Sequence, residues 1–316
     1  MALKDLLLVK LISAPRRAFS GEELAKEYNV SRAAVWKAVK ALQNDGYGIQ
    51  SSPRGYWLPM EKDELDSDLI RMAAADCRAP VYVFDTIDST NNYAKILAAK
   101  GTPHGTLVCA NHQTAGRGRQ GHSFWSPKDL GLYFSLIIHP MDTDHISRIT
   151  PAAAVAAVAA IEETAGIRPG IKWVNDLFVE KKKIAGILSE AVTDFETGKV
   201  NTVVIGIGIN CHPMQFPEEL EGIAGSLSEE VLSRSILAGR LWHNLLYWCE
   251  HLGDPELMEL YRRDSVVMNR KIIYHRDNVP YEGTVTAIND EGNLIVENPD
   301  GSTSLLHSGE ISIKEW

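Results

Sequence analysis

The sequence predicts an α+β protein in three parts, because the kind of secondary structure changes twice along its 316 residues. Residues 1–62 contain three short helical patterns and a small hairpin. Residues 63–268 alternate apolar strands with helices, and residues 269–316 contain only short strands separated by turns. This distribution predicts an N-terminal winged helix-turn-helix, a central mixed-sheet domain and a C-terminal SH3-like β-barrel.

The N-terminal part has the element lengths of a helix-turn-helix. Leucines from Leu3 to Leu11 share a helical face, and Ser20 and Ser31 are N-caps for two further helices. A basic outer face on the third helix, followed by a hairpin around Pro53-Arg54, favours DNA binding over a helical cap with a solvated face. The candidate DNA contacts are Ser31, Arg32, Trp36, Lys37 and Arg54.

Charge and composition limit the classes of partner. The net charge is −9, but residues 1–60 carry +4 and the remainder −13, so only the basic first part is expected to meet an anionic polymer. No apolar run approaches the roughly 18 residues of a membrane span. The four cysteines lack metal-ligand spacing and are typical of a reducing cytoplasm, so no residue is assigned as a metal ligand.

A glycine- and arginine-rich loop, Gly116-Arg117-Gly118-Arg119-Gln120-Gly121, is the most distinctive stretch. Glycine lets backbone N–H groups approach a ligand, and arginine offers charged donor pairs suited to phosphate. The loop is therefore interpreted as closing over a phosphate-bearing ligand, although an exposed flexible loop has the same composition. It also reads G-x-G-x-x-G, but the apolar stretch 130–138 that follows is a strand, which argues against a Rossmann site. The catalytic motifs of kinases and the P-loop are absent.

Other polar residues of the central part interrupt apolar strands or open a helix. Ser89, Thr90 and Asn91 are either a helix N-cap or contacts for a small polar ligand. Charged groups within apolar strands usually have partners, so Asp176 could hold a lysine or a magnesium ion. A lysine beside phosphate stabilises developing charge. Residues of this kind are Lys172, Asn175, Asp176 and Lys183.

Taken together, these motifs resemble those of the bifunctional biotin–protein ligase and biotin-operon repressor family. The resemblance covers nearly the whole chain and implies a biotin/lipoate ligase-like catalytic domain at its centre. The motifs occur in the family's order: Ser89-Thr90-Asn91, Gln113, Gly116–Gly121, Lys172–Asp176, Lys183–Leu188 and Gly206–Asn210.

The resemblance implies a two-step reaction. Biotin and Mg-ATP give biotinyl-5′-AMP and pyrophosphate, and the biotinyl group passes to a lysine of a biotin carboxyl carrier protein. The adenylate is expected to act as corepressor, favouring a homodimer that binds a palindromic operator. The C-terminal barrel is expected to complete the ATP and acceptor site.

The resemblance also implies residue roles. Lys183 would bridge the biotin carboxylate and the α-phosphate, and Lys172 and Asp176 would assist with phosphate, metal or the acceptor lysine. Arg117, Gly118 and Arg119 would order over biotin and the adenylate. Biotin would further contact Ser89, Thr90, Asn91, Gln113 and Gly186. The nucleotide would contact Gly116, Gly118, Arg119, Asn175 and Asn210.

The sequence departs from the usual family pattern at three places. His122 stands where arginine is frequent, Phe124-Trp125 reverses the usual order, and Val174 replaces a frequent proline. Two alternatives stay open. One is a lipoate or octanoate–protein ligase, which shares the central fold, and the other is a ligand-sensing repressor without catalysis. The N-terminal part and the Gly/Arg loop argue against the first, and Lys183, Arg117 and Arg119 argue against the second.

Overall fold

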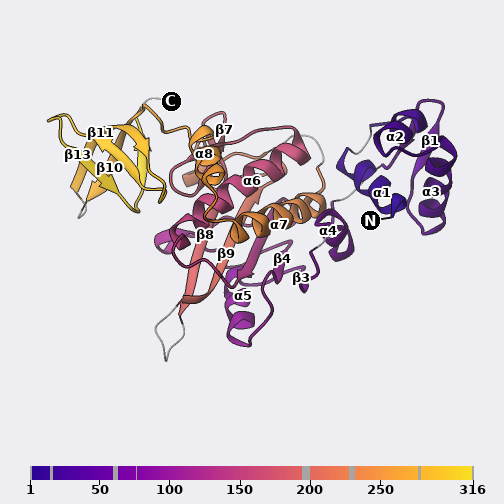
Figure 1. Ribbon diagram of the computed structural model, residues 1–316, viewed down its shortest axis with the longest axis horizontal. Helices are drawn as coiled ribbons and strands as arrows, with labels where there is room; N and C mark the ends of the chain where they lie inside the picture. Colours follow the sequence, from indigo (N-terminus) through magenta and orange to yellow (C-terminus); the bar gives the residue numbers. More distant parts are fainter. Residues whose placement is uncertain are drawn as a thin grey trace.

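The computed structural model places three parts in a row, with the helical head, the central sheet and the C-terminal β-domain following one another along the long axis (Figure 1). The order of these parts matches the predicted α+β arrangement. The structure describes residues 2–14, 17–59, 63–75, 77–193, 200–227, 232–276 and 279–314.

The head forms because two serines cap its second and third helices. Ser20 Oγ accepts a hydrogen bond from the backbone N–H of Glu23 at 3.0 Å, and Ser31 Oγ accepts one from Ala34 at 3.1 Å. Both predicted caps are confirmed, and Val35, Val39 and Leu42 face the core as expected. The elements of the head are α1 (Leu3–Ser13), α2 (Gly21–Glu27), α3 (Arg32–Asn44), β1 (Gln50–Ser52) and β2 (Gly55–Trp57).

The central sheet has seven strands in the order β3-β4-β5-β9-β8-β7-β6. Only β3 and β4 pair in parallel, so the sheet is mixed, as predicted. The strands are β3 (Val81–Phe84), β4 (Leu107–Ala110), β5 (Gly131–Ile138), β6 (Gly170–Lys172), β7 (Asp176–Val179), β8 (Lys182–Thr193) and β9 (Val200–Asn210).

Helices cover both faces of this sheet. Val204 of β9 packs with α5 (Thr90–Ala99), whereas its neighbour Ile205 belongs to the larger core that contains α6 (Ile149–Ala165) and α7 (Arg234–Glu250). Successive strand residues point to opposite faces, so α5 lies on one face and α6 and α7 on the other. Glycines of β8 and β9 leave space on the α5 face, which becomes the site described below.

The structure corrects the predicted strand over residues 171–177. Trp173–Asn175 form a turn, and β6 and β7 are the two arms of a hairpin in which Lys172 lies opposite Asp176. The peptide bond between Trp173 and Val174 is cis. Both polar side chains therefore lie near one hairpin end instead of following each other along one strand.

The predicted helix over residues 228–251 starts later. Ser233 Oγ accepts a hydrogen bond from the N–H of Ile236, so Ser233 is the N-cap and α7 begins at Arg234. Residues 228–231 lie outside the described part of the chain. Serine competes for backbone hydrogen bonds and favours a cap over a helix interior, which accounts for the later start.

The C-terminal domain is a five-stranded antiparallel sheet in the order β13-β12-β11-β10-β14. Its last strand, β14, was not predicted, because three residues carry too little periodicity. Trp173 of the hairpin turn donates its indole N–H to the Gly292 carbonyl at 2.9 Å, which ties this domain to the central sheet. Its elements, which follow α8 (Pro255–Arg263), are β10 (Lys271–Arg276), β11 (Val279–Ile288), β12 (Leu294–Glu297), β13 (Thr303–Leu306) and β14 (Ile311–Ile313).

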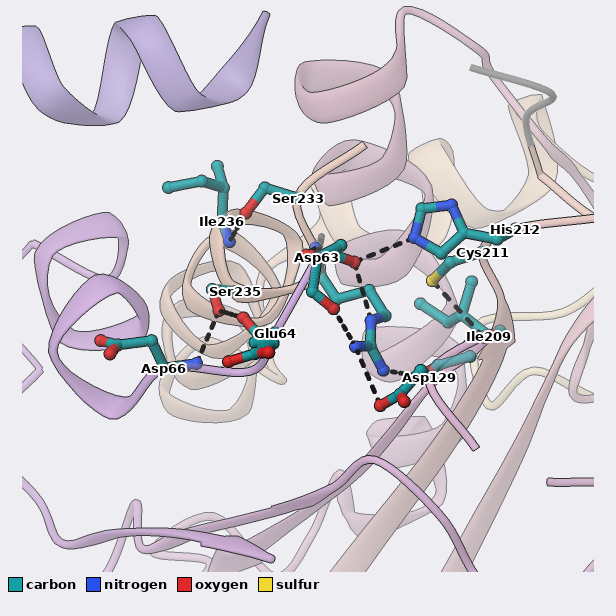
Figure 2. Close-up of polar contacts among 12 residues, drawn as sticks. Asp63, Glu64, Asp66, Asp129, Ile209, Cys211, His212, Ser233, Ser235 and Ile236 are labelled. Atoms are coloured by element: carbon teal, nitrogen blue, oxygen red, sulfur yellow. Dashed lines mark hydrogen bonds and ion pairs between the residues drawn. The ribbon is translucent and has the colours of Figure 1, made fainter. Parts of the chain in front are cut away.

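A buried ionic network joins the segment that follows the head to the rest of the central domain. Figure 2 shows the carboxylate of Asp63, just before α4 (Ser67–Ala73), facing the His212 ring. Asp63 Oδ2 lies 2.7 Å from Arg234 Nε and 2.9 Å from His212 Nε2. Ile236, two residues into α7, packs in the apolar cluster of the head. The start of α7 therefore contacts both the head and the segment that follows it.

Among the described residues, none of the helices combines the length and apolar character that crossing a bilayer requires. The helix α6 contains a run of alanines and is strongly apolar, and it is buried against the sheet. Its small side chains let it lie close to the sheet and to α7.

Candidate active site

A pocket opens on the α5 face of the sheet, where the glycines of β8 and β9 leave space. Its empty volume is about 470 Å3. It brings together residues that are almost 100 positions apart in the sequence, and most of the predicted ligand-binding residues are among them. The predicted residues that line it are Ser89, Thr90, Asn91, Gln113, Arg117, Gly118, Arg119, Asn175, Lys183 and Gly186.

The start of α5 supplies a polar wall. The hydroxyl and the N–H of Thr90 donate to Gln113 Oε1 at 3.1 and 2.9 Å. Ser135 Oγ lies 2.7 Å from Thr90 Oγ1 and 2.6 Å from Asn91 Oδ1. Ser89 caps α5, which confirms the N-cap interpretation of the Ser/Thr/Asn cluster, and it also lines the pocket, where contact with a ligand stays a prediction. The wall therefore offers uncharged donors and acceptors in a fixed arrangement.

Glycines form the floor of the pocket, because side chains of other segments occupy the space in which a Cβ atom would lie. A Cβ on Gly206 would lie 2.2 Å from Asn91 Oδ1, and a Cβ on Gly208 would lie 2.5 Å from the Phe124 ring. A Cβ on Gly186 would lie 3.3 Å from Lys183 Nζ, a tight contact, and 3.5 Å from the Phe124 ring, an ordinary one. Only glycine at positions 206 and 208 lets Asn91 and Phe124 approach the strands so closely.

The Gly/Arg loop lies across the pocket and is held on both sides. Arg117 Nη1 donates to Asn92 Oδ1 on α5 at 3.0 Å, and Arg119 Nη1 donates to Asn175 Oδ1 on the hairpin turn at 3.0 Å. At Gln120 the backbone has φ 53° and at Gly121 φ 81°, both left-handed. This turn directs the chain back so that Phe124 reaches the pocket.

Two lysines and one carboxylate lie at the pocket mouth. Lys183 Nζ is 2.8 Å from Asp176 Oδ1, a buried oxygen that has no hydrogen bond of good geometry within the described structure. Burial lowers the pKa of Lys172, while the nearby Asp176 carboxylate raises it and the Lys183 charge lowers it further. Asp176 and, more weakly, Glu310 offset the repulsion between the two lysines, and an anionic ligand would relieve it further.

A wider groove of about 2000 Å3 continues from the mouth. Its walls include Lys172, Asp176 and the exposed Trp125 of the loop. Residues 309–312 of the C-terminal domain also line this groove. There, His122 Nε2 of the loop lies 3.6 Å from Glu310 Oε1. The C-terminal domain therefore contributes to the groove instead of packing at a distance from it.

One predicted ligand residue lies apart from the others. Asn210 ends β9, is 5 % exposed, and donates its side-chain amide to the Gly225 carbonyl at 3.0 Å. It is absent from the lining of both the pocket and the groove. This hydrogen bond stabilises the segment that follows β9, so the role of Asn210 in the structure is structural.

Sequence reasoning did not select several residues that the structure brings to the site. Phe124, Tyr133 and Leu188 line the pocket, and Glu190 contacts two residues that line it. Gly186, Leu188 and Glu190 are two residues apart along β8 and share a face, so strand periodicity carried a signal for the last two. Phe124 and Tyr133 meet edge to face, 6.5 Å apart, which no local pattern indicates.

The head presents the predicted DNA-contact residues at its surface. Arg32, Trp36 and Lys37 are exposed on α3, and the Trp36 side chain is 53 % exposed. A groove between α3 and the β1–β2 hairpin is lined by Arg32, Trp36, Lys40 and residues 51–53. Arg54 is exposed at the hairpin tip, and Ser31 caps the helix. The arrangement is that of a winged helix-turn-helix.

The fold and the site together define a ligase of the biotin/lipoate A/B protein ligase family, which matches residues 83–210. A helix-turn-helix domain matches residues 4–57, and the biotin protein ligase C-terminal domain matches residues 271–314. Over 97 % of both chains, the protein is 34 % identical to the bifunctional ligase/repressor BirA of Bacillus subtilis. The chain belongs to the family of bifunctional biotin–protein ligase/repressors.

Further comparisons agree with this assignment. Identity to the bifunctional ligase/repressor of Escherichia coli is 29 %, over 93 % of this chain and 92 % of that one. The biotin protein ligase of Aquifex aeolicus in complex with biotin and ATP has a similar fold, with a TM-score of 0.63 and 24 % identity. The region of structural similarity covers 75 % of this chain and 99 % of the Aquifex aeolicus chain.

Proposed function

We propose that the chain is an ATP-dependent biotin–protein ligase that also represses transcription. In the first step an oxygen of the biotin carboxylate attacks the α-phosphate of ATP, forming biotinyl-5′-AMP and releasing pyrophosphate. In the second, the amine of a lysine in a biotin carboxyl carrier protein attacks the acyl carbon, forming an amide and releasing AMP. The observation that carries this proposal is the Lys183–Asp176 pair, because Lys183 lines both the pocket and the groove and Asp176 lines the groove.

The pocket suits a small molecule with several uncharged polar groups. Thr90, Asn91 and Gln113 would hold the ureido ring of biotin, since each offers hydroxyl or amide atoms. Phe124 and the glycine floor would pack against its apolar rings and chain. The carboxylate would then point toward Lys183, the cation at the mouth.

Lys183 is the proposed principal catalytic cation. Its ion pair with Asp176 holds the ammonium at the mouth before substrates arrive. Binding of the biotin carboxylate and the α-phosphate would place two anions on the same ammonium, which reduces their repulsion and stabilises charge that develops during attack. Lys172 would supply a second cation, and Asp176 would be left to orient the acceptor lysine.

Magnesium is proposed to enter with ATP. The described residues contain no group of three or more acidic, histidine or cysteine side chains able to hold a metal. Mg2+ commonly binds through one or two carboxylates plus substrate phosphates and water, a pattern that the single buried oxygen of Asp176 fits. When bound, the ion neutralises phosphate charge.

The loop is proposed to protect the mixed anhydride. Arg117 and Arg119 already hold it over the pocket, with Gly116 and Gly118 in its backbone. Excluding water would prevent hydrolysis of the adenylate before transfer. Asn175, which contacts Arg119, would lie beside the nucleotide, and Asn210 would act only through the segment it supports.

Regulation is proposed to use the head. The exposed face of α3 and the wing would bind a palindromic operator as part of a homodimer that biotinyl-5′-AMP favours.

We assign residues 1–62 to this DNA-binding domain, 63–268 to the catalytic domain and 269–316 to the C-terminal domain. Three of the cysteine thiols in the described chain are buried. Burial raises the pKa of Cys211 and Cys249 to about 12 and that of Cys109 higher still. Free, unreactive thiols are typical of proteins in the reducing cytoplasm, which is the proposed location.

Pyrophosphate exchange into ATP tests the first step. The protein is supplied with biotin, lipoate or octanoate in turn, and labelled pyrophosphate is followed into ATP. Exchange with biotin alone is expected. Exchange with lipoate or octanoate would replace the proposed substrate by that of a lipoate or octanoate ligase, and no exchange with any acid would identify a ligand-sensing repressor.

A further inference from the structure

Glu190 is a partly buried carboxylate on β8 that contacts three side chains from two other segments. Its Oε2 accepts a hydrogen bond from Asn91 Nδ2 at 3.0 Å, and its Oε1 accepts one from Lys95 Nζ at 3.0 Å. Arg117 Nη2 lies 3.7 Å from the same Oε1. One carboxylate therefore joins the first two turns of α5 to the Gly/Arg loop.

The Asn91 contact fixes the orientation of a pocket side chain. Because Glu190 and the Leu188 carbonyl accept from Nδ2, and Ser135 donates to Oδ1, the two ends of the amide are distinguished. Asn91 Oδ1 lies above Gly206, so this orientation decides which polar atom the wall presents there. An unpaired carboxamide could rotate and exchange its donor for its acceptor.

The Arg117 contact keeps a cation at the pocket edge without neutralising it. Glu190 carries one negative charge, and Lys95 and Arg117 carry two positive charges. Burial raises the pKa of Glu190, but the Asn91 and Lys95 hydrogen bonds and the two nearby cations bring it below its ordinary value, so the carboxylate stays ionised at neutral pH. The cluster thus retains one net positive charge for an anionic ligand.

We propose that Glu190 is a positioning residue: it orients Asn91 in the pocket wall and holds Arg117 in the closed loop. The inference deepens the proposed ligase function, because biotin recognition and retention of the adenylate then depend on one carboxylate. Glu190 itself is not in the pocket lining and touches no reacting atom in this account. It acts through the two residues that it holds.

Limited trypsin digestion of the full chain without substrates is the first test. Trypsin cleaves after Arg117 and Arg119 faster when the loop opens, because cleavage needs a backbone that can leave its folded conformation. Glu190→Gln keeps the side-chain size and removes the charge, and it should speed cleavage there about tenfold, given usual coupling energies between contacting residues. Glu163→Gln, which removes a carboxylate paired with Arg240 far from the pocket, is the matched control and should cleave like the wild type.

A second variant separates positioning from mere support of α5. Lys95→Met removes one partner of Glu190 but leaves Arg117 as its remaining cation, so loop cleavage should be unchanged or slower than in the wild type. If Lys95→Met and Glu190→Gln opened the loop equally, Glu190 would serve only to hold α5. Equal cleavage of Glu190→Gln and the wild type would also overturn the proposal.

Adenylate retention is the functional readout. After biotinyl-5′-AMP has formed on the enzyme, its release should be about tenfold faster from Glu190→Gln, and the KM for biotin should rise more than kcat falls. In the Arg117→Met background, Glu190→Gln should add little to adenylate release, because its partner in the loop is already gone. Additive effects would contradict the coupling.

These measurements separate the inference from the proposed function. A wild-type protein that forms no adenylate would refute the ligase proposal, while the trypsin comparison would still decide whether Glu190 positions the loop. If the wild type and Glu190→Gln retained the adenylate equally well, the role of Glu190 would be refuted and the ligase proposal would stand.

Discussion

Asp63 and Arg234 form a buried ion pair across 171 residues of sequence, with Asp63 Oδ2 2.7 Å from Arg234 Nε (Figure 2). The backbone N–H of Arg234 donates to the same carboxylate, and its guanidinium also donates to the carbonyl groups of Asp63 and Gly131. The Arg234 side chain is completely buried. The pair therefore joins the segment after the head to α7 and to the start of β5.

Removing this carboxylate should destabilise the protein strongly. Asp63→Ala removes the nearer and buried one of the two carboxylates that pair with the buried Arg234 guanidinium, and breaking a buried pair in this way costs roughly 3–5 kcal/mol of unfolding free energy. Asp129→Asn is the control, because Asp129 is half exposed and 3.8 Å from Arg234, so its loss should cost about 1 kcal/mol or less. Urea unfolding measures both, and equal midpoints for Asp63→Ala and wild type would contradict the prediction.

Lys183→Ala should abolish most adenylation while the fold remains. The change removes the cation proposed to contact both reacting groups, and loss of one such charge commonly lowers rates about 100-fold or more. Pyrophosphate exchange measures the effect, and thermal unfolding serves as the check on the fold. Near-normal exchange would end the proposed role of Lys183. Lys183→Arg keeps the charge but changes its shape, and should recover only part of the rate.

Gly206→Ala should impair biotin binding through a clash in the pocket floor. The new Cβ would lie 2.2 Å from Asn91 Oδ1, and Asn91 cannot move freely because Ser135 and Glu190 hold it. A rise in the biotin KM of about tenfold or more is expected, from the loss of one or two polar contacts. Gly48→Ala, which meets no neighbouring atom, is the matched control. A wild-type KM in Gly206→Ala would show that the wall adjusts.

Lys37→Ala should weaken DNA binding without affecting adenylation. Lys37 is exposed on α3 beside Trp36, where a phosphate contact is expected. Losing one such contact should reduce the slope of log affinity against log salt by about 0.9. Fluorescence anisotropy with a mixed-sequence duplex measures the slope, and pyrophosphate exchange confirms that the catalytic domain is intact. An unchanged slope would place Lys37 away from the DNA.

The stability contribution of Lys172 should depend on pH. Burial lowers its pKa in the folded state, so between that lowered value and its ordinary value of 10.5 the unfolded chain binds more protons than the folded one. In that window stability rises with pH. Lys172→Met removes the burden of a buried charge, so the gain in unfolding free energy over wild type should be largest below the window and shrink as pH rises toward 10.5. A gain independent of pH would contradict the assignment.

Local patterns in the sequence accounted for much of the fold. Ser20 and Ser31 cap helices, because an N-cap needs only a side-chain oxygen and the next few backbone N–H groups. Most strands of the sheet followed from apolar runs, and the polar motifs together with the family resemblance identified ten of the eighteen described residues that line the pocket. The resemblance of these motifs to a known family then connected them to one chemistry.

The tertiary structure decided what depends on pairing between distant segments. The hairpin placed Lys172 opposite Asp176, and the positions of α5 and of the Gly/Arg loop beside β8 brought Asn91, Lys95 and Arg117 to Glu190. The Asn210 side chain lies inward, where its amide donates to the Gly225 carbonyl of a later segment. Such contacts are set by strand register and by how layers pack, and a one-residue change in register would reverse the face of each side chain. A single sequence therefore shows which residue types are available, whereas the fold determines which of them meet.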